Sequence, residues 1–368
     1  MNRRTFRAAV PAALALTLGL VACSGENEPT TTPGGEGTSA SDLSGSIAGA
    51  GASTQTAAQQ AWAAEFNAQN PDVTVNYDPV GSGAGREQFL TGGVPFAGSD
   101  AYLDEEELAA SEERCAGGNA IDLPVYVSPI AVAYNLPGVD GLQLSPTTLA
   151  NIFNGTITTW NDPAIAADNP GVQLPDTRVN PVHRSDDSGT TENFTDYLHA
   201  TAPDVWTTEP DGEWPLQTGE AAQGTSGVVQ AIGAGEGSIG YADESQVAAS
   251  DLQSAALKVG ENWVAPSAEA AATALDSSSR VEGRPEGDIA IEIDRTTTAD
   301  GAYPLFIVSY AIACTAYEDA TQGELVKAYL TYVTSEEGQQ AAADNAGSAP
   351  ISDTLREDIT TSLDMIGA

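Results

Sequence analysis

The sequence predicts an α/β protein, and three strand–turn–helix units are the main reason for this prediction. In each unit a turn of small residues leads into a helix-like stretch. Strand-like and helix-like stretches also alternate through the rest of the chain, which indicates α/β architecture with largely parallel sheets. The length that remains after the N-terminal segment suits two domains.

The most informative turn is R-S-D-D-S-G-T-T (Arg184–Thr191), which precedes a helix expected at Glu192–Leu198. Free backbone N–H groups and the positive end of the helix dipole attract anions at such a position. The arginine adds a planar clamp that binds an oxyanion through two hydrogen bonds. Taken alone, an ordinary capped helix beside a surface arginine is the better explanation.

Two further turns are of the same kind, namely Gly49–Thr54 (G-A-G-A-S-T) and Gly81–Gly85 (G-S-G-A-G). Glycines let the backbone approach a ligand closely, and Ser53, Thr54 and Ser82 stand where N-cap hydroxyls stand. Three such turns, one of them with an arginine, favour an anion-binding site over three unrelated helix caps.

The other elements are expected from hydrophobic periodicity and from residues that begin helices. For example, Ser145 is placed as a cap, and Pro146 suits the first turn of a helix. The acidic run Asp104–Glu107 is interpreted as a solvated helix N-terminus and not as a metal site. In chain order, the expected elements are a helix at Gln55–Phe66, a strand at Val73–Tyr77, a short helix around Phe89–Leu90, a strand at Val125–Tyr134, a helix from Ser145 through Phe153, a helix at Ser267–Leu275, a strand at Leu305–Val308 and a helix at Glu324–Tyr332.

Several motifs together resemble one family, the phosphate-binding lipoproteins of bacterial ABC transporters. Besides the turns Gly49–Thr54 and Gly81–Gly85, the matching motifs are Phe96–Asp100 (F-A-G-S-D), His183–Thr191 (H-R-S-D-D-S-G-T-T), Ile152–Ile165 (I-F-N-G-T-I-T-T-W-N-D-P-A-I) and Gly237–Tyr241 (G-S-I-G-Y). They occur in the family's order and span nearly the whole mature chain. One departure is Thr54, where the family often has phenylalanine.

The resemblance implies a two-lobed, periplasmic-binding-protein-like fold, with two mixed sheets flanked by helices and a hinge between the lobes. It implies that residues 43–129 and 258–368 form domain I and that residues 130–257 form domain II. It also implies a monomeric receptor that binds inorganic phosphate in the cleft, without a cofactor or metal, and delivers it to the permease and ATPase subunits of an ABC transporter. The ligand-binding residues implied are Ser53, Thr54, Ser82, Asp100, Arg184, Ser188, Gly189 and Thr190, and Asp186 is expected to hold the Arg184 guanidinium in place.

The N-terminal segment predicts export and lipid anchoring. A basic start and an apolar stretch end at Leu20–Cys23, a pattern similar to a lipobox, so residues 1–23 are expected to be a lipoprotein signal peptide with Cys23 acylated. Arg3 and Arg4 leave twin-arginine export as an alternative to the general route. Residues 24–42 are rich in Gly, Thr, Pro and Ser, and we expect a flexible tether of roughly 25 Å. The protein should therefore lie at the extracytoplasmic face of the membrane.

Two cysteines remain after lipidation, Cys115 and Cys314. In an exported protein two such cysteines most simply form a disulfide, and the alternative is a pair of free buried thiols.

Composition and motifs exclude several classes of function. The formal net charge is −39, and the two lysines are Lys258 and Lys327, which argues against nucleic-acid partners. Neither a nucleophile elbow, nor a phosphate-binding loop of the nucleotide-binding type, nor a zinc-type spacing is present, so we expect no enzyme activity. His183 beside Arg184 is more consistent with a structural histidine than with a catalytic one. The alternatives that stay open are a receptor for another oxyanion, such as sulfate or molybdate, and a phosphatase related to binding proteins.

Overall fold

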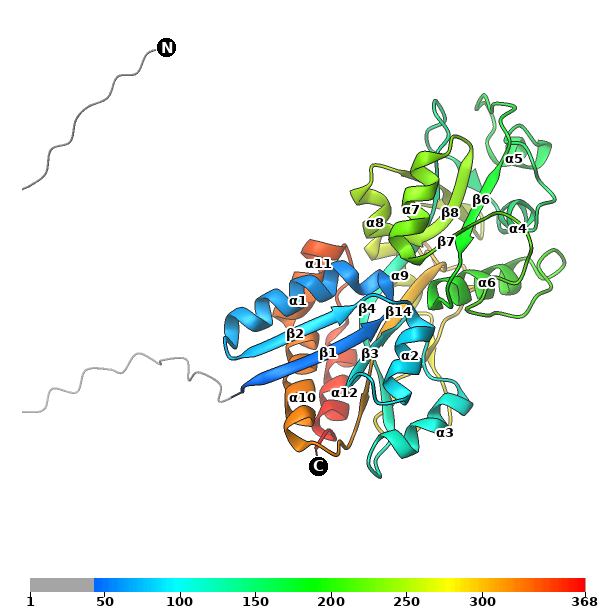
Figure 1. The fold of residues 1–368 in the computed structure, drawn as a ribbon. Coiled ribbons are helices and arrows are strands. Elements are labelled where there is room, and N and C mark those ends of the chain that lie inside the picture. The colour runs from blue at the N-terminus through cyan, green and yellow to red at the C-terminus, as the bar shows by residue number, and fades with distance from the viewer. Residues whose placement is uncertain (1–42, 368) are drawn as a thin grey trace, which may run out of the picture. The chain divides into compact units, whose positions relative to one another are not determined.

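The computed structural model describes residues 43–367, and a mixed β-sheet runs through the centre of the fold (Figure 1). The strand order is β2-β1-β3-β14-β4-β8-β6-β7, and β9 pairs with β4 beside this path. The bounds are β1 Gly45–Gly51, β2 Val73–Asp78, β3 Phe96–Ser99, β4 Ala120–Tyr134, β6 Asn180–Arg184, β7 Glu220–Ala222, β8 Ser238–Asp243, β9 Gln253–Ser254 and β14 Phe306–Cys314.

Strand β4 belongs to two regions of this sheet. Its residues Ala120–Pro129 pair with β14, and its residues Ile130–Tyr134 pair with β8. We call β1, β2, β3, β14 and the first part of β4 the first sheet region. The second sheet region contains β6, β7, β8, β9 and the rest of β4. All fifteen residues of β4 are buried, because both faces of the strand are covered.

The expectation of largely parallel sheets is wrong in part. Strand β1 is parallel to β2 and β3, and β6 is parallel to β7 and β8. However, β14 is antiparallel to β3 and β4, and β4 is antiparallel to β8 and β9. The described residues fall within one compact unit, Ser41–Ala368, and the domain boundaries given above stay a prediction.

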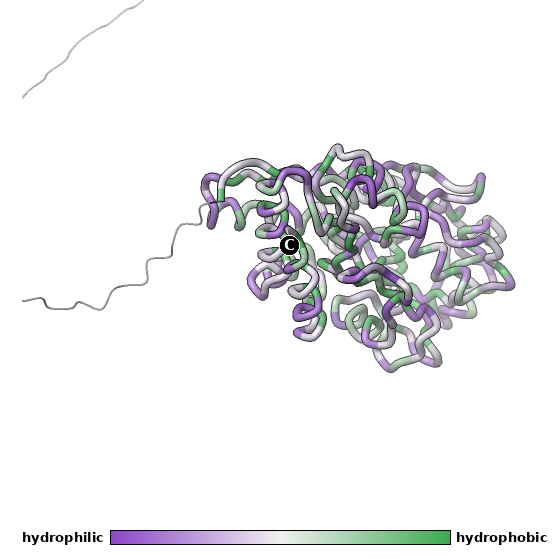
Figure 2. Tube along the Cα trace, turned by 90° about the horizontal axis from the view of Figure 1, so that it is seen from below, coloured by the Kyte–Doolittle hydropathy of each residue, from purple (hydrophilic) through white to green (hydrophobic). Residues whose placement is uncertain are grey.

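Helices cover both sheet regions. In Figure 1, α1, α10, α11 and α12 lie around the first sheet region and α4 to α8 around the second, and the change of hydropathy along the chain can be followed in Figure 2. A short 3₁₀ helix, Ser53–Gln55, precedes α1. The helices are α1 Thr56–Gln69, α2 Ser82–Leu90, α3 Glu105–Arg114, α4 Pro146–Phe153, α5 Pro163–Asp168, α6 Gly189–Thr201, α7 Gly224–Ala234, α8 Glu244–Ala249, α9 Ala268–Leu275, α10 Ala320–Thr334, α11 Glu336–Ala346 and α12 Asp353–Asp364.

Two small sheets complete the fold. One has the order β11-β10-β5, and the other pairs β12 with β13. Their bounds are β5 Gln143–Leu144, β10 Ala256–Val259, β11 Asn262–Val264, β12 Ser279–Arg280 and β13 Ile291–Glu292. The segment between β13 and β14 reaches the candidate site described below.

Several predicted helix starts agree with the structure. Ser145 is the N-cap of α4, and Pro146 is its first residue. The acidic run begins α3, where Asp104 and Glu107 form a capping box, so these carboxylates bind backbone N–H groups. Among residues 43–367, no cluster of three or more His, Cys, Asp or Glu side chains is arranged to hold a metal ion.

Three predicted N-caps are wrong. Ser53 and Thr54 lie inside the 3₁₀ helix that Ala52 precedes, and Ser82 is the first residue of α2, after Gly81. These three hydroxyl residues therefore lie within the first turn of a helix and not before it. The three hydroxyls instead have partners far away in the sequence, as described in the next subsection.

The structure contains the disulfide between Cys115 and Cys314. Cys115 is the C-cap of α3 and Cys314 is the last residue of β14, so the bridge ties a helix to the first sheet region across a sequence separation of 199 residues. Both half-cystines are fully buried.

The predicted signal peptide, residues 1–23, its lipidated Cys23 and the tether, residues 24–42, lie outside the described residues. In the part of the chain that is described, no helix is long and apolar enough to cross a membrane.

Candidate anion-binding site

The three turns that the sequence singled out lie together at the ends of strands. The 3₁₀ helix and α1 follow β1, α2 follows β2, and α6 follows β6. The helices therefore begin where the strands end, which is where ligands of open α/β sheets bind. The predicted side chains at this place are almost completely removed from solvent; they are Ser53, Thr54, Ser82, Asp100, Arg184, Ser188 and Thr190.

Asp100, directly after β3, is the centre of the cluster. Its Oδ1 accepts hydrogen bonds from Thr54 Oγ1 at 2.7 Å and from Ser309 Oγ at 2.6 Å, and its Oδ2 accepts one from Thr190 Oγ1 at 3.0 Å. The backbone N–H of Asp100 donates to Ser82 Oγ at 3.1 Å. Asp100 therefore brings together four hydroxyl residues from separate parts of the chain.

Thr54 is the residue at which this chain departs from the resembling family. Its hydroxyl is one of the three donors to the Asp100 carboxylate, a contact that phenylalanine could not make. The neighbouring Ser53 makes a different contact, because its Oγ accepts a hydrogen bond from the Thr225 backbone N–H at 3.1 Å. Ser53 and Thr54 thus point to two different partners.

Arg184, the last residue of β6, forms a two-bond pair with Asp186. The guanidinium donates from Nε to Oδ1 at 2.8 Å and from Nη2 to Oδ2, and Asp186 Oδ1 also accepts the Gly224 backbone N–H at 3.0 Å. The structure thus contains the expected pair. The side chain of Arg184 is 2 % exposed, so the aspartate balances a buried charge.

The start of α6 has the geometry expected for an anion-binding helix. Ser188 is the N-cap, and its Oγ accepts the backbone N–H groups of Thr190 and Thr191. Gly189 packs against Asp100 so closely that a Cβ atom there would lie 2.8 Å from the Asp100 Cβ. A larger residue at position 189 would push the helix away from Asp100.

Burial and neighbouring charges act in different directions on the two carboxylates. Burial raises the pKa of Asp100, although the hydroxyl donors Ser309, Thr54 and Thr190 and the charge of Arg184 oppose this rise. Burial would also raise the pKa of Asp186, but the hydrogen bonds and charge of Arg184 outweigh it and lower that pKa. Asp186 therefore stays ionised beside Arg184. For Asp100, burial favours the protonated form, and hydrogen bonds from three hydroxyl groups favour the ionised form.

His183 has a structural environment. Its ring stacks on Trp214, with centroids 4.9 Å apart, and its Nδ1 donates to the Arg184 carbonyl at 2.8 Å. Burial lowers the pKa of His183, so the neutral ring is favoured. This agrees with the structural interpretation of the histidine.

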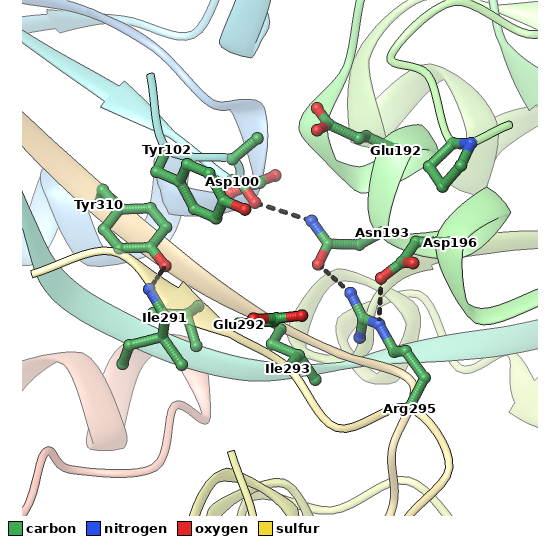
Figure 3. Close-up of a pocket in the computed structure, with 13 residues that line it drawn as sticks. Asp100, Tyr102, Glu192, Asn193, Asp196, Ile291, Glu292, Ile293, Arg295 and Tyr310 are labelled. Carbon is green, nitrogen blue, oxygen red and sulfur yellow. Dashed lines mark hydrogen bonds and ion pairs between the residues drawn. The ribbon is translucent and has the colours of Figure 1, made fainter. Parts of the chain in front are cut away.

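Five residues of this neighbourhood were not predicted from the sequence. Ser309 donates to Asp100, while Gly224 and Thr225 present the first N–H groups of α7 to Asp186 and Ser53. Asn193 and Arg295 join the backbone around Asp100 to α6, as Figure 3 shows. For Gly224 and Thr225 the sequence had a weak signal, because G-T-S-G opens a helix in the way that the three recognised turns do.

Comparison with known proteins identifies the family. The model of the PBP superfamily domain matches residues 35–337. The phosphate-binding protein PstS 3 of Mycobacterium leprae is 36% identical over 321 residues, which cover 86% of this chain and 85% of the relative. The phosphate-binding protein PstS 2 of Mycobacterium tuberculosis is 33% identical over 368 residues, which cover 98% of both chains.

Solved structures agree on the fold. A phosphate-binding protein from Stenotrophomonas maltophilia has a TM-score of 0.63 at 19% identity and covers 86% of this chain and 94% of its own. An ABC-type phosphate transport receptor from Vibrio cholerae has a TM-score of 0.53 at 18% identity, over 83% of this chain and 100% of its own. The predicted two-lobed α/β fold of the periplasmic-binding-protein type is thereby confirmed. The chain belongs to the PBP superfamily domain and, within it, to the family of the PstS phosphate-binding proteins.

Proposed function

We propose that this protein is a receptor that binds inorganic phosphate at the Asp100 cluster and delivers it to the permease of an ABC transporter. The residues assigned to the ligand are Ser53, Thr54, Ser82, Asp100, Arg184, Ser188, Gly189 and Thr190. The names of the relatives, all phosphate-binding proteins, support this choice of ligand.

The observation that carries the proposal is an ionisable carboxyl group, Asp100, among the donors of an anion site. A carboxylate repels an oxyanion unless the ligand brings a proton that the carboxylate can accept. Monobasic and dibasic phosphate both carry such a proton, and sulfate at neutral pH carries none. Asp100 therefore favours phosphate over sulfate.

The remaining groups supply the hydrogen bonds that replace water around the anion. The start of α6 places the Gly189 backbone N–H and the Ser188 hydroxyl at the positive end of a helix, where they can donate to the anion. Arg184 has five N–H donors, and its contacts with Asp186 involve Nε and Nη2, which leaves Nη1 for the ligand. Dehydration of phosphate is offset only by such a nearly complete set of donors.

Delivery requires that the receptor stay near the membrane. We propose that a lipid on Cys23 anchors the mature protein to the extracytoplasmic face and that residues 24–42 let it reach the permease as a monomer. The strongly acidic chain does not prevent phosphate binding, because distant surface charges are screened beyond about 8–10 Å at physiological ionic strength.

Calorimetric titration with phosphate, alone and in competition with sulfate and molybdate, tests the ligand. We expect phosphate to bind and neither competitor to displace it at equal concentration. If sulfate or molybdate bound more tightly than phosphate, that anion would be the ligand of this receptor. Hydrolysis of a chromogenic phosphate ester would instead favour the phosphatase alternative.

The anchor has its own test. We expect the full-length protein to sediment with membranes and a Cys23→Ser variant to be released from them. Mass analysis of the mature N-terminus should show a diacylglyceryl cysteine, and an unmodified Cys23 would contradict the anchor.

A further inference from the structure

Arg295 is a buried arginine outside the ligand-binding set, in the segment between β13 and β14. It is 5% exposed, and its guanidinium is held by four partners. Nη1 donates to the carbonyl groups of Pro304 at 3.0 Å and Phe306 at 2.8 Å, Nε donates to Asp196 Oδ2 at 2.8 Å, and Nη2 donates to Asn193 Oδ1. Figure 3 shows the contacts with Asp196 and Asn193. The first two partners are near the start of β14, and the other two are on α6.

The side chain of Asn193 links Arg295 to the candidate site. Its Nδ2 donates to the carbonyl oxygen of Asp100 at 2.7 Å and to that of Gly189 at 2.7 Å. Only one amide orientation satisfies these contacts, since Arg295 can only donate and the two carbonyl groups can only accept. Arg295 therefore fixes the amide so that its two N–H donors face Asp100 and Gly189.

The bonds cross from one sheet region to the other. Asp100 follows β3, and Arg295 is tied to the start of β14, both in the first sheet region. Gly189 and Asn193 belong to α6, which follows β6 of the second sheet region. The network joins the two regions at the point where Gly189 approaches Asp100 most closely.

A cavity of about 300 Å³ borders this network. Asp100, Asn193 and Arg295 are all in its wall, together with Glu192 and Asp196 (Figure 3). The hydrogen bonds of Asn193 and Arg295 thus border the same space as Asp100. If these bonds were lost, the start of α6 could move away from Asp100 and widen this space.

We propose that Arg295 and Asn193 are positioning residues for phosphate. They hold the N-terminus of α6 against Asp100 and thereby set how long the ligand stays bound. This role rests on the proposed function, because it presumes that phosphate binds between Asp100 and α6. Contacts that hold a site closed act after the ligand has entered, so their loss changes mainly the dissociation rate.

The test compares Arg295→Lys and Asn193→Ala with the wild type and with Arg284→Lys. Arg284 is a matched control, because it is also a largely buried arginine with two carboxylate partners, Asp122 and Asp288. Its third partner is the carbonyl group of Leu103, so its hydrogen bonds do not reach α6. Association and dissociation rates are measured with radiolabelled phosphate, by filter binding and by chase with unlabelled phosphate. Thermal unfolding of each variant records the change in stability.

We expect Arg295→Lys and Asn193→Ala to raise the dissociation rate by about tenfold or more and to leave the association rate within about threefold. Arg284→Lys should lower the unfolding temperature without changing the dissociation rate. Asn193→Ala decides the matter if Arg295→Lys does not fold.

An unchanged dissociation rate in folded Asn193→Ala, with a wild type that binds phosphate, would overturn the positioning role and leave the proposed function intact. An equal rise in Arg284→Lys would also overturn it, since the effect would then follow from lost stability alone. A wild type that does not bind phosphate would refute the proposed function itself, and the inference with it.

Discussion

Replacing Asp100 by asparagine tests how the candidate site distinguishes phosphate from sulfate. The substitution removes the negative charge and keeps the shape of the side chain. An amide oxygen at Oδ1 still accepts from Thr54 and Ser309, and an amide N–H at the other position can donate to the Thr190 hydroxyl, which can act as donor or acceptor. The hydroxyl cluster is therefore expected to survive the change.

The magnitude follows from the contacts that each anion makes with the carboxylate. Phosphate would lose one hydrogen bond to a charged group, about 1.5–3 kcal/mol, but the repulsion between ligand and carboxylate would disappear as well. Sulfate would be relieved of the same repulsion and, in addition, of an unpaired polar contact of about 1–3 kcal/mol. Discrimination should therefore shrink by about 2.5–6 kcal/mol, or roughly 10²–10⁴ in the ratio of dissociation constants. Phosphate affinity itself should change much less.

Calorimetric titration of the wild type and of Asp100→Asn with phosphate and with sulfate, at the same pH and ionic strength, measures the ratio of the two dissociation constants for each protein. Asp122→Asn is a matched control, because Asp122 is also a fully buried aspartate but is paired with Arg284 outside the hydroxyl cluster. We expect the control to lose stability and keep the phosphate-to-sulfate ratio. If Asp100→Asn excluded sulfate as strongly as the parent, recognition of the ligand's proton would belong to another residue.

Three other predictions concern affinity, the disulfide and pH. Arg184→Ala should weaken phosphate binding by about 3–5 kcal/mol in calorimetry, because a desolvated charged donor is lost and Asp186 is left unpaired; near-wild-type affinity would remove Arg184 from the site. Replacing Cys115 and Cys314 by alanine should lower the free energy of unfolding in denaturant by at most about 5 kcal/mol, given the long loop that the bridge closes, and two alkylatable thiols in the native oxidised protein would contradict the bridge. Burial raises the pKa of Glu192 from its ordinary value of 4.5 to about 7. Between these two pH values Glu192 is protonated in the native state and ionised in the unfolded state. The stability that the protein with protonated Glu192 has at low pH is therefore lost as pH rises through about 7. Glu192→Gln should therefore stabilise the protein at pH 8 by on the order of 1 kcal/mol relative to wild type, with a smaller difference at pH 5, and equal pH slopes of stability in the two proteins would show that Glu192 titrates normally.

Features that depend on near neighbours in the chain could be predicted from the sequence. The Arg184–Asp186 pair spans two residues, and Ser188 caps the helix that begins at the next residue. Such contacts form within one turn, so the local order of residue types is enough to specify them. The cysteine bridge was predictable for a different reason, because two cysteines remained once Cys23 was assigned to the lipid.

The failed N-cap predictions show where local reasoning stops. Ser53, Thr54 and Ser82 have residue types that cap helices, and the sequence offered no competitor for their hydroxyl groups. In the folded chain these hydroxyls bind Thr225 and Asp100, at sequence separations of 172, 46 and 18 residues. These hydroxyl groups therefore form tertiary hydrogen bonds, whereas local propensity predicted hydrogen bonds to the backbone N–H groups of the next helix.

The sequence by itself determined the α/β pattern and the three turns. Only the tertiary structure decided which side chains complete the site, because their contacts are long-range. Ser309 lies 209 residues from Asp100, and Arg295 lies 102 residues from Asn193. A lone serine, asparagine or arginine carries no signal of such a partner. Its role is set by the strand order that places β14 beside β3 and the start of α6 against Asp100.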